Sequence, residues 1–166
     1  MKKIIILFIF SISISFGQNI ESEKIHEIDS IYESINKLKK TEYKTLESSG
    51  LIKKKKLIFF KKNIGRFNED VIYRNNKILK ITYVELMKGK VKNERYYFSE
   101  NNLIKYEIRT FDEIEIKKNE INCVAYFNNG KLIKFWSDKE TEFEASEIQR
   151  KANELNSKYL EFQKNE

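Results

Sequence analysis

Four short polar turns in the middle of the chain determine how its strands can pair. They fall at Asn75-Asn76, Lys88-Gly89-Lys90, Ser99 to Asn102 and Asn129-Gly130. Asparagine and glycine tolerate the positive φ that tight hairpin turns require. Connections this short join antiparallel neighbours, because a parallel pair needs a long crossover. We therefore expect an antiparallel meander in this part of the chain.

Apolar and polar residues alternate between these turns, which is typical of strands with one buried face. Apolar residues recur at steps of three and four over 20–40 and 144–163, which predicts a helix at each end. The predicted fold is α+β: an N-terminal helix, an antiparallel β-meander of about six or seven strands, and a C-terminal helix packed on the sheet. Strong curvature could instead produce a half-barrel whose interior the helices line or plug. The predicted strands are 57–62, 70–74, 77–87, 91–98, 103–116, 120–127 and 131–137.

One pattern of residues occurs three times, at 73–81, 98–106 and 127–135. Each copy has an aromatic residue, a polar turn, two aliphatic residues, a lysine and an apolar residue. This residue pattern resembles that of MORN-type hairpin repeats, although the characteristic glycines of that family are mostly missing. No function is carried over from the family. The uneven spacing indicates recurring hairpin chemistry rather than a solenoid.

The turns also predict which side chains share a face of the sheet. If the hairpins close at Gly89 and across Ser99 to Asn102, Lys80 pairs with Phe98 and Tyr96 with Lys105. The lysines of the three repeats would then stand in a row, roughly 10 Å apart. The six candidate binding residues on this face are Lys80, Tyr96, Phe98, Lys105, Lys134 and Trp136. The opposite face, predicted as the core, carries Leu79, Ile81, Tyr83, Ile104, Tyr106, Ile108, Tyr126, Ile133 and Phe135.

Two interpretations of the candidate face stay open at this point. A helix could cover its aromatic residues while the lysine head groups reach water along their stems. Alternatively, exposed aromatics framed by cations would suit a protein partner or an anionic glycan.

The beginning of the chain has the pattern of a cleavable secretory signal. A basic start is followed by a run over residues 4–16 that is apolar apart from serines, and Gly17 supplies a small side chain for cleavage. We expect residues 1–17 to be removed and 18–166 to form one domain, periplasmic or secreted. The alternative is an uncleaved anchor, but the apolar run is shorter than the ~20 residues that span a bilayer. We expect no transmembrane segment in the mature chain.

The inventory of reactive residues is small. His26 and Cys123 are the only histidine and cysteine, which disfavours histidine-dependent triads and His/Cys metal sites. We expect His26 at the surface, Cys123 buried, and neither a metal nor a cofactor. Carboxylates remain as catalytic candidates, but they fall at turns and helix starts, where structure alone favours them. They are Asp112, Glu113, Glu115, Asp138, Glu140, Glu142 and Glu144.

The charge of the chain is modestly basic. Without Lys2 and Lys3, 30 Lys and Arg against 25 Asp and Glu leave a formal charge of +5. Such a charge is weak support for nucleic-acid binding, and no nucleic-acid partner is expected. The run 53–56 consists of four lysines between apolar residues. It could keep an edge strand from pairing with other chains, or attract lipid head groups or an acidic partner.

Together these features predict an exported, noncatalytic binding or interaction protein of the cell envelope or exterior. One alternative is a carrier of an apolar molecule in a curved sheet, which would need a deep apolar cavity. The other is a carboxylate-dependent hydrolase, which would need two carboxylates converging in a cleft.

Overall fold

The computed structural model describes residues 21–57, 60–113 and 121–164. The predicted signal peptide, residues 1–17, lies outside the described residues. Within the described part, no helix is both long and apolar enough to cross a membrane.

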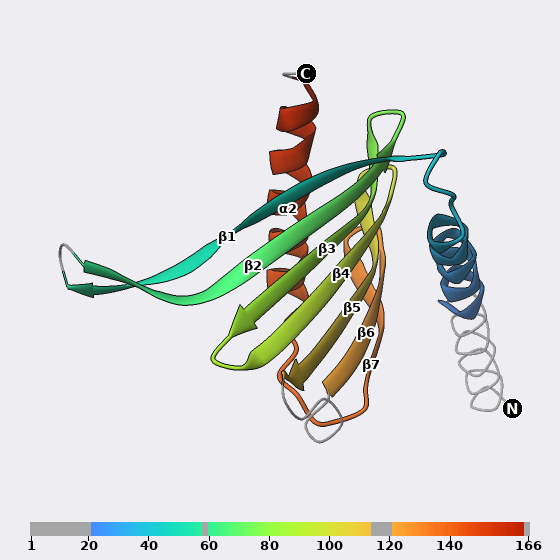
Figure 1. The fold of residues 1–166 in the computed structure, drawn as a ribbon. Coiled ribbons are helices and arrows are strands. Elements are labelled where there is room, and N and C mark those ends of the chain that lie inside the picture. Colours follow the sequence, from blue (N-terminus) through green and yellow to red (C-terminus); the bar gives the residue numbers. More distant parts are fainter. Residues whose placement is uncertain (1–20, 58–59, 114–120, 165–166) are drawn as a thin grey trace, which may run out of the picture.

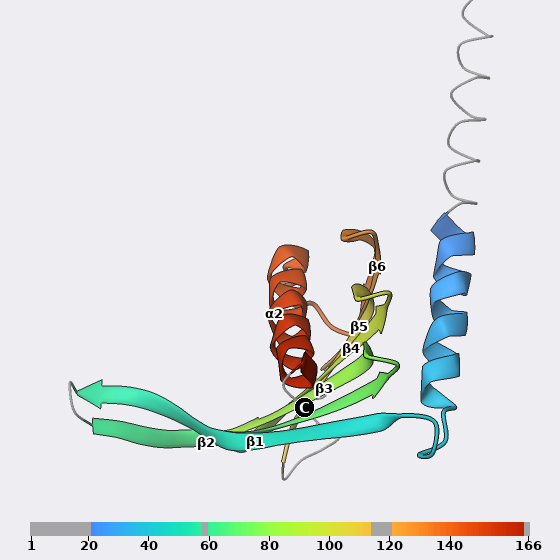
Figure 2. The ribbon, with the colours of Figure 1, turned by 90° about the horizontal axis from the view of Figure 1, so that it is seen from above.

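In the described part of the chain, seven strands form one antiparallel sheet in which each strand pairs with the next. The N-terminal helix, described over 21–36, lies on one face of this sheet, and α2 (Ala145–Lys164) packs on the other (Figures 1 and 2). The predicted α+β fold is confirmed. The helices lie on opposite faces, so the sheet is not a half-barrel enclosing both. The strands are β1 (Lys44–Leu57), β2 (Phe60–Arg74), β3 (Lys77–Met87), β4 (Lys90–Ser99), β5 (Asn102–Asp112), β6 (Ile121–Asn128) and β7 (Lys131–Ser137).

Two-residue turns close four of the hairpins. Asn75 and Asn76, for example, have φ of 52° and 59°. Positive φ at both central residues is the type I′ geometry, whose twist matches that of the flanking strands. The turns at Asn75-Asn76 and Asn129-Gly130 are as predicted. The other two are narrower than predicted and consist of Lys88-Gly89 and Glu100-Asn101.

A β-bulge follows the turn in each of the three repeats. In the β4–β5 hairpin, Tyr97 pairs with Lys105 but Phe98 pairs with Leu103, so Ile104 is an extra residue. Leu79 and Ile133 are the extra residues at the equivalent positions of β3 and β7. An extra residue reverses the alternation of side chains along a strand. Each repeat therefore directs its lysine to the face opposite its first aliphatic residue.

The main hydrophobic core lies between the sheet and α2. Burying a large apolar side chain contributes roughly 1.5–3 kcal/mol, so this face supplies most of the stabilisation. The predicted core is correct for Ile81 and Tyr106, and Tyr83, Ile108 and Phe135 pack against it. The buried cluster consists of Val71, Tyr73, Ile78, Ile81, Tyr96, Phe98, Leu103, Tyr106, Ala125 and Phe127 of the sheet with Ala152, Leu155 and Tyr159 of α2.

The rest of the predicted core is wrong. Leu79, Ile104 and Ile133 occupy the bulges and are only partly buried. Tyr126 lies on the other face of the sheet, where its hydroxyl contacts Asp29 of the N-terminal helix. The single-residue shift at each bulge accounts for both errors.

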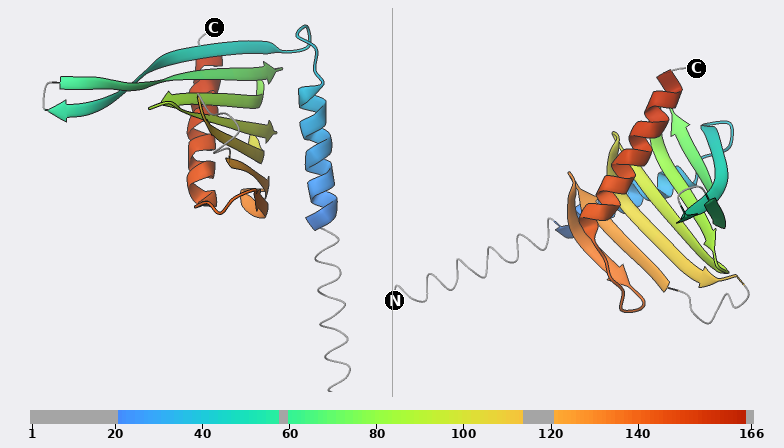
Figure 3. Two further views of the ribbon diagram at one scale, coloured as in Figure 1. Left: turned by 60° about the horizontal axis from the view of Figure 1, so that its bottom comes forward. Right: turned by 90° about the vertical axis from the view of Figure 1, so that its left-hand side faces the viewer.

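The first two strands are longer than predicted and extend past the rest of the sheet. The predicted strands 57–62 and 70–74 are replaced by β1 and β2, and β2 pairs with β3 only from Gly65 onward. Residues 53–57 and 60–64 therefore form a two-stranded ribbon beyond β3, which we call the arm (Figure 3). The lysine-rich sequence of the arm lacks the alternation of apolar and polar residues that indicates a strand with one buried face. The full length of β1 and β2 was therefore not predicted.

Candidate functional site

The structure does not bring the six predicted binding residues onto one face. Tyr96 and Phe98 lie under α2, with 0% and 1% of their surface exposed. The other four lie on the opposite face or its edge: Lys80, Lys105, Lys134 and Trp136. The prediction of a single mixed aromatic and basic face is therefore wrong, and a role for any of the six in binding stays a prediction.

Two local features explain this error. The two-residue turn at Lys88-Gly89 pairs Lys80 with Tyr97 instead of Phe98. The bulge at Ile104 pairs Lys105 with Tyr97 instead of Tyr96. Each shift moves the aromatic neighbour of a lysine by one residue, which transfers it to the other face.

The three lysines of the repeats do form a row, with tyrosines between them. Lys80 pairs with Tyr97, Tyr97 with Lys105, Lys105 with Tyr126, and Tyr126 with Lys134. Lys134 at one end is exposed, whereas Lys105 in the middle is only 5% exposed. The expectation that lysine head groups reach water is thus wrong for Lys105.

The N-terminal helix covers the centre of this row. Nζ of Lys105 lies 2.8 Å from Oδ1 of Asp29 and 3.7 Å from the centre of the Tyr32 ring. The Tyr126 hydroxyl donates a hydrogen bond of 3.1 Å to the same Asp29 oxygen. Burial alone would lower the pKa of Lys105, but the hydrogen bonds to Asp29 and Tyr126 outweigh it and raise the pKa. The row is a docking surface for the chain's own helix.

Trp136 stands apart from this contact. It lies on β7, at the edge of the sheet, and 51% of its surface is exposed.

A buried carboxylate lies on the opposite face, against α2. Glu94 is 2% exposed and accepts a hydrogen bond of 2.8 Å from the Tyr106 hydroxyl. It also pairs with Lys151 of α2 and, at 3.2 Å, with Lys92. Burial alone would raise the pKa of Glu94, but the two lysines and the hydrogen bonds from Lys151 and Tyr106 lower it. Glu94 is therefore held as an anion inside the interface.

A second buried carboxylate repeats this arrangement further along α2. Glu69 is 6% exposed, lies 2.5 Å from Nζ of Lys158, and accepts a hydrogen bond from Tyr159. Neither glutamate was predicted from the sequence as a functional residue. The available signal for Glu94 is its position two residues before Tyr96, which places both side chains on one face.

A cavity of about 250 Å³ lies beside Glu94, between β4 to β6 and the start of α2. We call it the Glu94 cavity. Tyr96 lines it, and in the described part of the chain its buried hydroxyl has no hydrogen-bond partner. Burial and then the charge of Glu94 raise the pKa of Tyr96, so the hydroxyl stays protonated. The hydroxyl therefore belongs to the buried polar cluster around Glu94 and is not open to the cavity.

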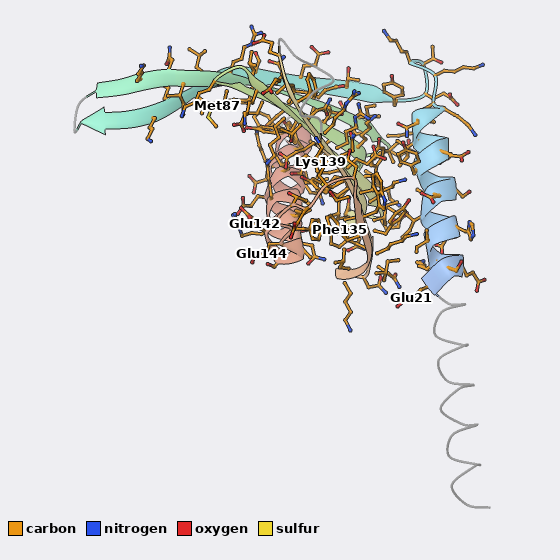
Figure 4. All side chains as sticks on the ribbon, turned by 90° about the horizontal axis from the view of Figure 1, so that it is seen from below. Glu21, Met87, Phe135, Lys139, Glu142 and Glu144 are labelled. Atoms are coloured by element: carbon orange, nitrogen blue, oxygen red, sulfur yellow. The ribbon has the colours of Figure 1, made fainter. Side chains whose placement is uncertain are left out.

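The carboxylates proposed as catalytic candidates do not converge as one group. Asp138 accepts hydrogen bonds of 2.9 and 2.8 Å from the backbone and side-chain nitrogens of Asn122, which join β7 to β6. These bonds, the backbone one first, lower the pKa of Asp138. Glu142 and Glu144 line the Glu94 cavity near the start of α2 (Figure 4), whereas Glu115 lies outside the described residues.

The predictions for the single histidine and the single cysteine are confirmed. His26 is exposed on the N-terminal helix, and Cys123 is buried and unpaired. Across 21–57, 60–113 and 121–164, no three His, Cys, Asp or Glu side chains gather in a way that could hold a metal ion.

The arm is strongly basic. Six lysines occupy 53–56 and 61–62, and the side chains described among them, Lys53, Lys54 and Lys62, are exposed. Leu57 and Phe60 pair at its far end. β1 is an edge strand of the sheet, and the lysine run lies within it instead of flanking it as predicted.

A glycine stands where the arm leaves the sheet. Gly65 forms the last pair between β2 and β3, opposite Met87. A Cβ at this position would collide with the backbone oxygen of Leu86. The close approach of the two strands at the base of the arm therefore requires glycine.

No known protein family, curated protein or solved structure matches the chain.

Proposed function

We propose that this chain is an exported, noncatalytic binding protein that attaches to anionic lipid surfaces of the cell envelope through its β1–β2 arm. The observation that carries this proposal is the projection of a lysine-rich ribbon beyond the sheet (Figure 1). A projecting ribbon can touch a flat surface without interference from the helices.

The charge of the arm favours an anionic surface. Each lysine near an anionic membrane contributes about 1 kcal/mol of attraction, which salt screens within a Debye length. The six lysines lie within ten residues, 53–62, so one contact can engage several of them. Lysine also suits this role because its ammonium is a compact charge on a flexible stem.

The apolar residues of the arm favour lipid over an acidic protein or glycan. Leu51 near the base of the arm is 57% exposed, and the sequence between the two lysine groups, 57–60, is apolar. Apolar side chains beside a basic cluster bind at the boundary between head groups and acyl chains. A soluble polyanion offers no such boundary.

The test is cosedimentation of the purified chain with vesicles of mixed phosphatidylglycerol and phosphatidylcholine, and with vesicles of phosphatidylcholine alone. We expect binding to the anionic vesicles only, weakening as salt is added. Replacing Lys53, Lys54 and Lys62 by glutamate should weaken that binding at least about a hundredfold, since three attractions of about 1 kcal/mol are lost.

A control with the same change in net charge separates the arm from the overall charge of the protein. Lys40, Lys131 and Lys139 are exposed and lie outside the arm. Replacing these three by glutamate should leave most of the binding intact. Equal losses in the two triple variants, or no preference for anionic vesicles, would refute the proposal.

A further inference from the structure

We infer that the sheet itself meets the lipid surface beside the arm, through the end of one face that neither helix covers. The membrane contact then extends from β1 across to β5. This inference rests on the proposed function and names the face that lies on the lipid. It is carried by five side chains, which we call the apolar row: Leu51, Arg66, Leu86, Val91 and Phe111.

The pairing register places the apolar row on the face where the N-terminal helix docks. Its five members are direct neighbours on adjacent strands, β1 to β5. Leu86 stands six residues after Lys80 with no register shift between them, so the two side chains share a face. Nζ of Lys80 donates a hydrogen bond of 3.2 Å to Asn36 of the N-terminal helix.

The N-terminal helix does not extend to the apolar row. Its contacts with Lys80, Lys105 and Tyr126 all lie in the row of lysines and tyrosines. Six residues of extended strand separate that row from Leu86, a distance of roughly 20 Å. α2 packs on the opposite face, so no helix in the described part of the chain covers this end of the sheet (Figure 1).

Four apolar side chains in line are unexpected on an uncovered face. The open face of an antiparallel sheet ordinarily carries polar residues. Leu51 is 57% exposed, and Leu86, Val91 and Phe111 are half-buried without a described helix above them. A continuous apolar strip of this kind marks a contact surface.

The charges around the strip indicate an anionic partner. Next to the apolar row, two residues away along each strand, lies a second row: Ser49, Asn68, Val84, Asn93, Arg109 and Asn122. Arg66 and Arg109 are exposed, and neither row contains a carboxylate. The Arg109 guanidinium lies 5.5 Å from the centre of the Phe111 ring. Such a pair suits the head-group boundary, where the ring meets acyl chains and the guanidinium meets phosphate.

The arm continues the same surface. Leu51 lies two residues before the lysine run, and Arg66 follows Gly65 at the base of the arm. Seen from above, β1 and β2 run in one line from the sheet into the arm, and α2 lies on the other side (Figure 2). A flat lipid surface can therefore contact the arm lysines and the apolar row together.

The test uses one tryptophan probe at a time and brominated lipids, which quench tryptophan on contact. Trp136 is the only tryptophan, so each probe is placed in a Trp136→Phe background. Leu51→Trp and Phe111→Trp report on the two ends of the apolar row. Phe162→Trp is the matched control, because Phe162 is 59% exposed on α2, on the opposite face. With phosphatidylglycerol vesicles we expect quenching and a blue shift for both row probes, and neither for the control.

The outcomes separate this inference from the proposed function. Quenching of Leu51→Trp without quenching of Phe111→Trp would mean that only the arm touches lipid, and would overturn the inference alone. Equal quenching of the control would do the same. Absence of binding by the wild-type chain would refute both proposals. Leu86→Trp supplies a further probe within the row, so that a folding defect of Phe111→Trp, detected by urea unfolding, does not leave the question open.

Discussion

The two helices are held on the sheet by ion pairs of opposite polarity. Against α2, the sheet supplies buried carboxylates, Glu69 and Glu94, and the helix supplies Lys158 and Lys151. Against the N-terminal helix, the sheet supplies the buried cation Lys105 and the helix supplies a carboxylate. The α2 interface also contains the main apolar cluster, whereas a row of lysines and tyrosines forms the other.

This difference indicates how each helix finds its own face. A helix placed on the wrong face would bring like charges together in a poorly solvated interface, which is strongly unfavourable. Apolar packing does not discriminate in this way, because most amphipathic helices can cover most apolar faces. We therefore expect α2 to supply stability and the charge pattern to supply specificity.

The largest expected effect tests the claim that the main core lies under α2. Phe98→Ala removes a fully buried ring and should lower the free energy of unfolding by about 4 kcal/mol, measured in urea. Trp136→Ala removes a larger ring that is 51% exposed, and its effect should be below about 1 kcal/mol. Similar effects in the two variants would mean that these residues share one open face, as the sequence suggested.

The second prediction concerns the charge at the centre of the α2 interface. Glu94→Gln keeps the shape but leaves Lys151 and Lys92 without a carboxylate, and should cost about 2–3 kcal/mol at pH 7. Because the folded pKa of Glu94 is lowered, its contribution is complete above the ordinary value of 4.5 and declines as pH falls below it. The difference between wild type and variant should therefore shrink in acid. A difference that is constant from pH 7 to pH 3 would contradict this account.

The parts of the fold that the sequence predicted are those encoded locally. Asn75-Asn76 and Asn129-Gly130 specify their turns through φ, and the helices follow from apolar residues on one stripe. The face of each strand was not predictable in this way. Leu103 and Ile104 are both aliphatic and both precede Lys105, so nothing local marks Ile104 as the extra residue. One residue of difference inverts the face.

The Glu94–Lys151 pair and the projection of the arm could not be predicted from the sequence, for different reasons. Lys151 and Glu94 are 57 residues apart in the chain, and only the packing of α2 brings them together. The arm was visible as a lysine run, but its projection depends on where β3 ends, at Met87, relative to Gly65. The sequence shows which residues are charged. Their positions in space depend on the pairing register of the strands and on the packing of α2.

The smallest expected effect tests the lysine row as a docking surface. Asp29→Asn removes the carboxylate from Lys105, whose side chain is 7% exposed, and should weaken docking of the N-terminal helix by about 1–2 kcal/mol. Hydrogen exchange should accelerate in residues 21–36 more than in β3 to β6, because the main core is untouched.

Glu33→Gln is the matched control for this change. Glu33 lies on the same helix and pairs with Lys37 at 2.7 Å, but both side chains are more than half exposed. Exposed pairs of this kind contribute little, so exchange in 21–36 should change by less than about 0.5 kcal/mol. If both variants loosened the helix equally, intrinsic helix stability would govern its position. If only Asp29→Asn does so, the buried lysine of the sheet holds the helix in place, and the polarity of the two interfaces distinguishes the helices.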